Sequence, residues 1–214
     1  MRSITRILAR TIAGRATRTG KSGVQSRRRG NSVVPRGAGL ALLVVPVTLC
    51  CTTAGAQEFS KGPVIELFGP VVDVPDSTFN LVPGTRYRIL FDVASGSRDR
   101  HELNPRLESA ARFINMHARA GIDPADLQVE IITHGGTTWD VLSDVAYRRR
   151  FDRDNPNTAL LAALGEAGVV IRQCGQSAAF NGVSAEELAP QVSMAVSAMT
   201  VVVRRQAEGW ALLQ

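Results

Sequence analysis

The chain has 214 residues, of which 44% are hydrophobic and only 5% aromatic. This composition fits one sizeable globular domain or two small ones and excludes a disordered or collagen-like chain. The formal net charge of +6 is confined to one end, because residues 1–56 hold ten of the 25 Lys and Arg residues and none of the 19 Asp and Glu residues. Residues 57–214 therefore carry 15 basic and 19 acidic groups, a net charge of −4. Nucleic-acid binding driven by overall charge is excluded for this part of the chain.

Residues 1–56 have the features of a basic leader that ends in a signal peptide. An Arg-rich segment precedes an uncharged apolar run at residues 37–49, and Ala54-Gly55-Ala56 forms an A-x-A cleavage site. We predict cleavage before Gln57 and export to the periplasm. The apolar run is shorter than the roughly 20 residues that a membrane-spanning helix needs, so no stable membrane span is expected after cleavage. Arg27-Arg28-Arg29 leaves open whether export uses the Sec or the twin-arginine route.

Residues 57–82 read as a proline-punctuated connecting arm, in which the apolar piece at residues 64–68 either forms a short edge strand or packs on the core. Strands then alternate with helices over residues 83–214. The patterns predict strands at 87–93, 129–133, 169–173, 192–196 and 210–213. They predict helices from Pro105 to the stop at Gly121, at 139–151, from Asn155-Pro156 to Gly168, in a short piece after Ser184, and at 199–208. This alternation indicates one α/β domain with a mostly parallel five-stranded sheet.

Cys174 is the single cysteine left after the predicted cleavage, so it can form no internal disulfide. Parallel strands present their carboxyl ends at one edge of a sheet, which places Cys174 at that edge with Ser95, Asp99 and His134. If residues 175–180 begin a helical turn, its unpaired N–H groups favour the thiolate of Cys174. Arg172 precedes the cysteine by two residues and therefore shares its side of the strand. The alternative is a buried, inert cysteine.

The residues around this cysteine carry a family resemblance. The segment from Ala167 to Ser177 reads Ala-Gly-Val-Val-Ile-Arg-Gln-Cys-Gly-Gln-Ser, and Gly182-Val183 follows eight residues after the cysteine. It resembles the DsrE/DsrF-like family, sulfur-relay proteins of the DsrE and TusD type, and the similarity runs from about Arg86 to Gln214. The resemblance implies a three-layer α/β/α domain, assembly into trimers or hexamers or with related subunits, and a persulfide on Cys174. Asn181 departs from the family pattern, in which a basic residue is frequent at that position.

The function predicted on this basis is an exported sulfur carrier or sulfurtransferase that exchanges sulfur with a partner protein or a small thiol. Cys174 is its reactive residue, and its supporting residues are His134, Arg172, Gly175, Gln176 and Ser177. One alternative is an oligomeric module that binds a small ligand or a protein without thiol chemistry. Another is a cysteine hydrolase in which His134, with Asp99, acts as the base. The simpler interpretation of His134 is a strand-end residue before a tight turn, with His101 in a loop and His117 on a helix surface.

No metal or other cofactor is predicted, because three scattered histidines and Cys174 form no recognisable ligand set. Residues 135–138, Gly-Gly-Thr-Thr, lack a nucleotide-binding pattern and read as a turn. The run at residues 148–150 lies close to Asp152 and Asp154, which favours an ion-paired helix face over an anion site. Residues 199–203 are apolar on more than one helix face, which favours burial against another subunit or against the arm.

Overall fold

The computed structural model describes residues 58–214. The leader, its cleavage site and the predicted start at Gln57 lie outside the described residues. No helix within the described part of the chain is long and apolar enough to span a membrane.

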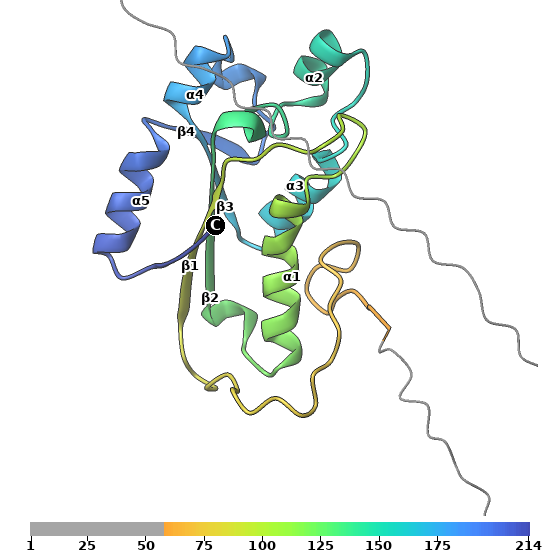
Figure 1. Cartoon of the computed structure of the whole chain (residues 1–214), viewed down its shortest axis with the longest axis vertical. Coiled ribbons are helices and arrows are strands. Elements are labelled where there is room, and N and C mark those ends of the chain that lie inside the picture. The colour runs from red at the N-terminus through yellow and green to blue at the C-terminus, as the bar shows by residue number, and fades with distance from the viewer. Residues whose placement is uncertain (1–57) are drawn as a thin grey trace, which may run out of the picture. The chain divides into compact units, whose positions relative to one another are not determined.

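The sheet has five strands, all parallel, in the order β4-β3-β2-β1-β5 (Figure 1). The strands are β1 (Tyr87–Val93), β2 (Leu127–Thr133), β3 (Val170–Cys174), β4 (Val192–Ala195) and β5 (Ala211–Leu213). The chain steps from β1 to β4 in one direction and then returns to place β5 beside the other side of β1. The predicted α/β class with a parallel five-stranded sheet is confirmed.

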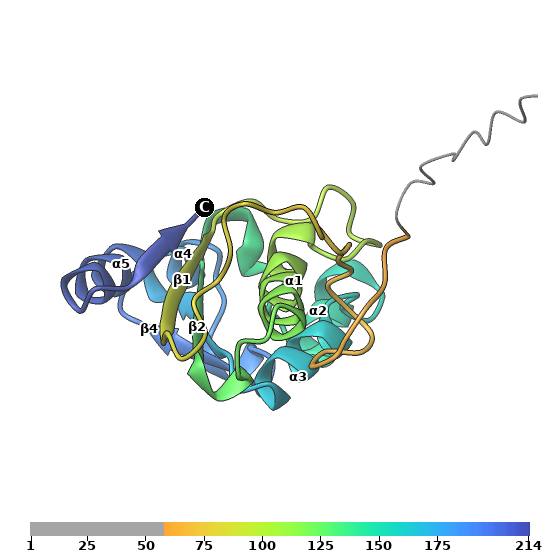
Figure 2. The ribbon, with the colours of Figure 1, turned by 90° about the horizontal axis from the view of Figure 1, so that it is seen from below.

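Helices cover both faces of the sheet, which makes three layers. The helices are α1 (Pro105–Arg119), α2 (Asp144–Phe151), α3 (Thr158–Glu166), α4 (Gly175–Phe180) and α5 (Ala198–Ala207), with short 3₁₀ turns at Pro124–Asp126, Gly135–Thr138 and Ala185–Glu187. Figure 2 shows α5 on one side of the strands and α1, α2 and α3 on the other. The short helix α4 follows β3 directly, at the carboxyl edge of the sheet (Figure 1).

The alternation of side chains along the strands divides the core in two. Odd-numbered strand residues such as Ile89, Phe91 and Ile131 pack with α1, α2 and α3 in the larger cluster. Even-numbered residues Leu90 and Ile132 pack with Cys174 and with residues of α5 in a smaller one. Cys174 therefore belongs to the α5 side of the sheet.

The arm has no regular strand at residues 64–68, and it packs on α1 instead. Ile65 is buried in the larger core cluster. Asn115, fully buried on α1, accepts from the backbone N–H of Val64 and Ile65 and donates to the carbonyls of Ile65, Phe68 and Gly69. Of the two alternatives predicted for this segment, a short edge strand or packing on the core, the structure shows packing on the core. The described arm does not cover the apolar face of α5.

Two predicted helix starts are wrong. Residues 139–143 are not helical, and α2 begins at Asp144 because the Ser143 hydroxyl accepts from the N–H of Ala146. The helix predicted from Asn155-Pro156 begins at Thr158. Asn155 is not the N-cap of this helix. Its Oδ1 accepts from the N–H of Asn157, which precedes the helix, and its amide donates to the carbonyls of Asp140 and Leu142 and thereby ties this loop to the segment before α2.

Candidate functional site

Three chemically active side chains meet at the carboxyl edge of the sheet. Ile132 of β2 pairs with Asp92 of β1 and with Arg172 of β3. His134 lies two positions beyond Ile132, and Cys174 two positions beyond Arg172, so all five residues lie on the α5 side of the sheet. Asp92, His134 and Cys174 line one pocket of about 370 Å³, closed on its other side by Ala198, Met199 and Val202 of α5. We call this the thiol pocket.

Cys174 is the last residue of β3 and the N-cap of α4, so the helical turn expected after it is present. The residue is 4% exposed. Burial alone raises the pKa of its thiol, but hydrogen bonds from the backbone N–H groups of Ser177, Ala198 and Gln176 and from the Ser177 hydroxyl outweigh it, so the pKa of Cys174 lies below its usual value. The thiol therefore ionises more readily than an ordinary buried cysteine.

Ser177 and Gly175 hold this arrangement in place. The Ser177 hydroxyl accepts from the N–H of Gly135 at 3.1 Å, which leaves its own proton to be donated to the cysteine sulfur. A Cβ atom on Gly175 would lie 2.7 Å from the carbonyl oxygen of Ala195, so only glycine lets α4 start this close to the end of β4. Both residues are among the supporting residues expected from the sequence.

His134 is hydrogen-bonded to a carboxylate. Its Nε2 lies 2.8 Å from Oδ1 of Asp92, and the two side chains are 30% and 17% exposed. The prediction that Asp99 would partner this histidine is wrong. Asp99 lies in the exposed loop after β1, where its carboxylate accepts from the N–H of His101. The interpretation of His134 as a strand-end residue before a tight turn describes its backbone, since the 3₁₀ turn Gly135–Thr138 follows it, but its side chain also lines the thiol pocket.

The same part of the chain carries a family match. The model of the DsrE/DsrF-like family matches residues 86–214, which is most of the described chain. The chain belongs to the DsrE/DsrF-like family. Membership indicates a function of the sulfur-relay type at the level of the family, and the resemblance noted around Cys174 is confirmed.

Solved structures similar to this DsrE-like chain include the two proteins described next. The protein MTH1491 from Methanobacterium thermoautotrophicum, described as being of unknown function, is 21% identical over 59% of this chain and 97% of its own, with a TM-score of 0.42. The ychN protein from E. coli is 14% identical over 59% of this chain and 96% of its own, with a TM-score of 0.41. Among curated proteins, none matches the chain.

Arg172 shares the face of Cys174 in this DsrE-like domain, but the structure gives it a different partner. Its Nε donates to Glu130 at 2.7 Å and one terminal nitrogen reaches the Ser193 hydroxyl. Glu130 is fully buried and is also held by Arg205 of α5 at 2.6 Å. Arg172 therefore shares with Arg205 the carboxylate that holds α5 to the sheet. Among the described residues, no hydrogen bond or ion pair joins Arg172 to Cys174.

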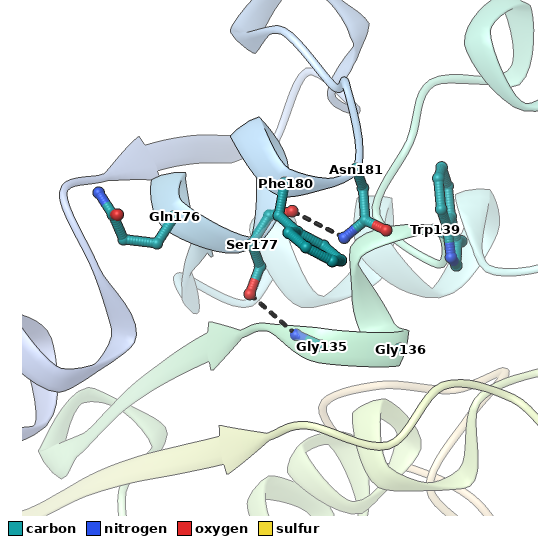
Figure 3. A pocket seen from close by; sticks show the side chains of 7 residues that line it. All are labelled: Gly135, Gly136, Trp139, Gln176, Ser177, Phe180 and Asn181. Carbon is teal, nitrogen blue, oxygen red and sulfur yellow. Dashed lines mark hydrogen bonds between the residues drawn. The ribbon is translucent and has the colours of Figure 1, made fainter. Parts of the chain in front are cut away.

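A second pocket, of about 390 Å³, adjoins the thiol pocket and shares Gln176 and Ser177 with it. Figure 3 shows Ser177 pointing from α4 to the turn at Gly135, with Phe180 and Trp139 on the side away from Gln176. Phe180 is 91% exposed. The amide of Asn181, which stands where a basic residue is frequent in the family, donates to the Ser177 carbonyl at 2.7 Å and so braces α4 (Figure 3).

The remaining sequence predictions about charged and metal-binding residues have mixed outcomes. The ion-paired face of α2 is confirmed, since Arg148 pairs with Asp154, and Arg149 and Arg150 pair with Glu187. The placement of His117 on a helix surface is wrong. Its ring is buried and stacks on Phe113, with a centroid separation of 3.7 Å. Within residues 58–214, no group of three or more His, Cys, Asp or Glu side chains is arranged so that it could hold a metal ion.

Sequence reasoning missed two contributors to the site. The prediction places Asp92 inside the strand at 87–93 and gives it no role, although an acidic residue directly after the buried run Ile89-Leu90-Phe91 is a signal that it serves that end of the sheet. The N–H of Ala198 was not predictable, because its approach to Cys174 depends on how α5 docks. The first signal was available from the period-2 pattern, whereas the second exists only in three dimensions.

Proposed function

We propose that this protein is an exported sulfur carrier that holds a sulfane sulfur as a persulfide on Cys174. The observation that carries the proposal is the cysteine in the thiol pocket, whose sulfur receives hydrogen bonds from the start of α4 and from Ala198 and whose pKa is lowered. A thiolate is the reactive form in sulfur transfer. Family membership supports the same type of function.

For the transfer of sulfur, the main task of the protein is to stabilise the anion on Cys174. The thiolate of Cys174 attacks the outer sulfur of a donor persulfide, R–S–SH; one S–S bond forms on the cysteine as the donor's S–S bond breaks, and R–S⁻ leaves. The product, Cys174–S–SH, loses its proton to become a persulfide anion. The hydrogen-bond donors that face the sulfur in the free protein are suited to hold that second anion.

The test is intact-protein mass spectrometry of residues 57–214 after exposure to a small-molecule persulfide. We expect a mass increase of one sulfur atom that dithiothreitol removes, and no increase in Cys174→Ser. Because Cys174 is the only cysteine in this segment, the adduct can be assigned without peptide mapping. The proposal is wrong if the folded wild-type protein gains no sulfur.

We propose further that the working form is exported and begins at Gln57. The basic segment, the apolar run at residues 37–49 and Ala54-Gly55-Ala56 support this. N-terminal sequencing of the protein recovered from a bacterial periplasm should give Gln57 as the first residue. Recovery of the full chain from the cytoplasm alone would contradict export.

The exposed apolar side chains of α5 support assembly into a homo-oligomer, proposed as a trimer or hexamer. Met199 and Val203 are 76% and 70% exposed, and Val196 just before the helix is 75% exposed. Water-exposed apolar side chains grouped in this way favour burial at an interface. Sedimentation of the wild type and of Met199→Lys should show the wild type alone as an oligomer; a monomeric wild type would contradict assembly.

A cysteine hydrolase is a second candidate, favoured by one observation. The thiol pocket holds a cysteine, a histidine and a carboxylate bonded to that histidine, the residue types of a hydrolytic triad. Hydrolysis predicts turnover of activated esters, with a burst from an acyl-enzyme, that is lost in Cys174→Ser. Stable loading with sulfur and no ester turnover would favour the carrier.

A further inference from the structure

We propose that His134 protonates the thiolate that leaves the sulfur donor, and that Asp92 positions His134 for this step. The inference rests on the proposed sulfur-carrier function and assigns to the thiol pocket a proton-transfer pair. In this pair His134 is the catalytic residue and Asp92 is a positioning residue.

The pair is placed by strand register. β1 supplies Asp92, the residue after β2 is His134, and β3 ends in Cys174, all on the α5 side of the sheet and all lining one pocket. The 2.8 Å bond from Nε2 of His134 to Asp92 occupies one ring nitrogen. No hydrogen bond engages the other nitrogen, Nδ1, within the described residues, so Nδ1 is the ring atom that remains for a molecule in the pocket.

The surroundings make the pair the source of protons in this pocket. Asp92, His134 and Cys174 are its titratable lining residues, since α4 contributes Gln176 and Ser177, and α5 with its N-cap contributes Ser197, Ala198, Met199 and Val202. The nearest ion pair on the same face, Glu130 with Arg172 and Arg205, is closed on itself. Among these groups the imidazole is the one that most often transfers protons in enzymes, and its Nδ1 has no other partner within the described residues.

The position of the Asp92–His134 pair also argues against a purely structural role. His134 and Asp92 keep 30% and 17% of their side chains exposed, and their bond joins two strands already paired along their length. The buried polar network beneath it, in which Gln173 bridges Thr133 and Thr138, already ties β2, β3 and the turn at Gly135–Thr138 together. Strand pairing therefore does not depend on the Asp92–His134 bond.

In the proposed step, sulfur transfer to Cys174 is coupled to proton transfer from His134. Cys174–S⁻, R–S–SH and the His134 imidazolium give Cys174–S–SH, R–SH and neutral His134. The new persulfide is more acidic than R–SH and returns a proton to His134, so the pair is ready for another cycle and no oxidant or reductant is consumed. Sulfur moves from one thiol to another while the net proton count of the pocket is unchanged.

The test compares donors that differ in their leaving thiol. An alkyl persulfide releases a strongly basic thiolate that needs a proton, whereas an aryl persulfide releases a weakly basic one that does not. In His134→Gln, we expect loading from the alkyl donor to slow by about 100-fold, the usual contribution of a general acid, and loading from the aryl donor to be much less affected. The final stoichiometry of sulfur on Cys174 should be unchanged.

Asp92→Asn should slow alkyl-donor loading less than His134→Gln does. Its effect should also be confined to the alkyl donor, because Asp92 acts only through His134. The matched controls are His101→Gln and Asp99→Asn, which alter a histidine and an aspartate in the exposed loop after β1. Both controls should behave like the wild type with both donors.

Alkylation by iodoacetamide separates proton donation from activation of the thiol, because the departing iodide needs no proton. The alkylation rate of His134→Gln should equal that of the wild type. If His134→Gln and Asp92→Asn load from the alkyl donor as fast as the wild type, the proton-transfer pair is wrong while the sulfur carrier stands. If the wild type takes up no sulfur, both fall. If His134→Gln does not fold, Asp92→Asn provides the test. The inference is wrong if, at every pH, the loading rates of Asp92→Asn and of the wild type depend equally on the donor's leaving thiol.

Discussion

Cys174 is subject to two opposing effects. Its near-complete burial raises the pKa of the thiol, and hydrogen bonds from Ser177, Ala198 and Gln176 lower it by more. Most of these donors are backbone N–H groups, which side-chain substitution cannot remove. The Ser177 hydroxyl is the exception. Removing this one oxygen atom by substitution tests how a single hydrogen bond affects the ionisation of the sulfur.

Ser177→Ala should raise the pKa of Cys174, because the side-chain hydrogen bond that favours the thiolate is lost. A hydrogen bond to a charged group contributes about 1.5 kcal/mol, so alkylation at a pH below the wild-type midpoint should slow by about tenfold. The measurement is the rate of iodoacetamide labelling against pH. Ser177→Thr, which keeps the hydroxyl, is the control; an unshifted profile in Ser177→Ala would show that the backbone donors alone set the ionisation.

At the scale of elements, α5 matters because it closes the thiol pocket. Its attachment to the sheet depends on Glu130 of β2, whose carboxylate is 1% exposed and is shared by Arg172 of β3 and Arg205 of α5. Arg205 also lies over the Trp210 ring at 4.6 Å. A buried carboxylate needs such partners, and here they join three elements.

Glu130→Ala should lower the free energy of unfolding by about 3 kcal/mol, because it leaves two arginines without the buried carboxylate that they share. Urea denaturation of the variant measures this. Arg204→Ala is the matched control, since the pair that Arg204 forms with Glu208 is exposed to solvent and should contribute little to stability. Equal losses in the two variants would mean that the buried carboxylate does not hold α5.

The starts of α2 and α3 show where reasoning about elements from sequence fails. Both segments contain residues that favour a helix N-terminus, but Asn155 is used for long-range bonds to Asp140 and Leu142, and α3 starts after it. Asn104 forms the same kinds of bond, since its Oδ1 accepts from the N–H of Arg106 and its amide donates to the Ser95 carbonyl and to Asp140, yet α1 starts at Pro105 as predicted. An Asn-Pro pair therefore does not by itself fix the residue at which a helix starts.

For the molecule as a whole, one half-buried carboxylate, that of Glu187, should govern part of the dependence of stability on acid pH. Hydrogen bonds from Arg150, with further donors from Ser184 and Arg149, lower the pKa of Glu187 from 4.5 to about 2. A carboxyl whose folded pKa is depressed stabilises the fold above its unfolded pKa, and this stabilisation is lost as the pH falls from about 4.5 to about 2.

Glu187→Gln should therefore have a lower urea midpoint than the wild type at pH 7, and the difference should shrink between pH 4.5 and pH 2. The raised pKa of Asp140, caused by its burial, acts in the opposite direction in both proteins and cancels in the comparison. Glu166→Gln, at an exposed carboxylate of α3 with no ion pair among the described residues, should show no such convergence. A constant difference at all pH values would contradict this assignment.

The sequence by itself determined the five strands, the parallel α/β class and the place of Cys174 at the end of β3, because these follow from local periodicity and from chain direction, which neighbouring residues encode. It also brought His134 to the same edge. Only the tertiary structure decided that the histidine's carboxylate is Asp92 rather than Asp99, that Arg172 pairs with Glu130 rather than serving the sulfur, and that α5 supplies a donor to Cys174. These pairings join residues 24 to 42 positions apart. Such choices depend on strand register and helix docking, which no local pattern specifies.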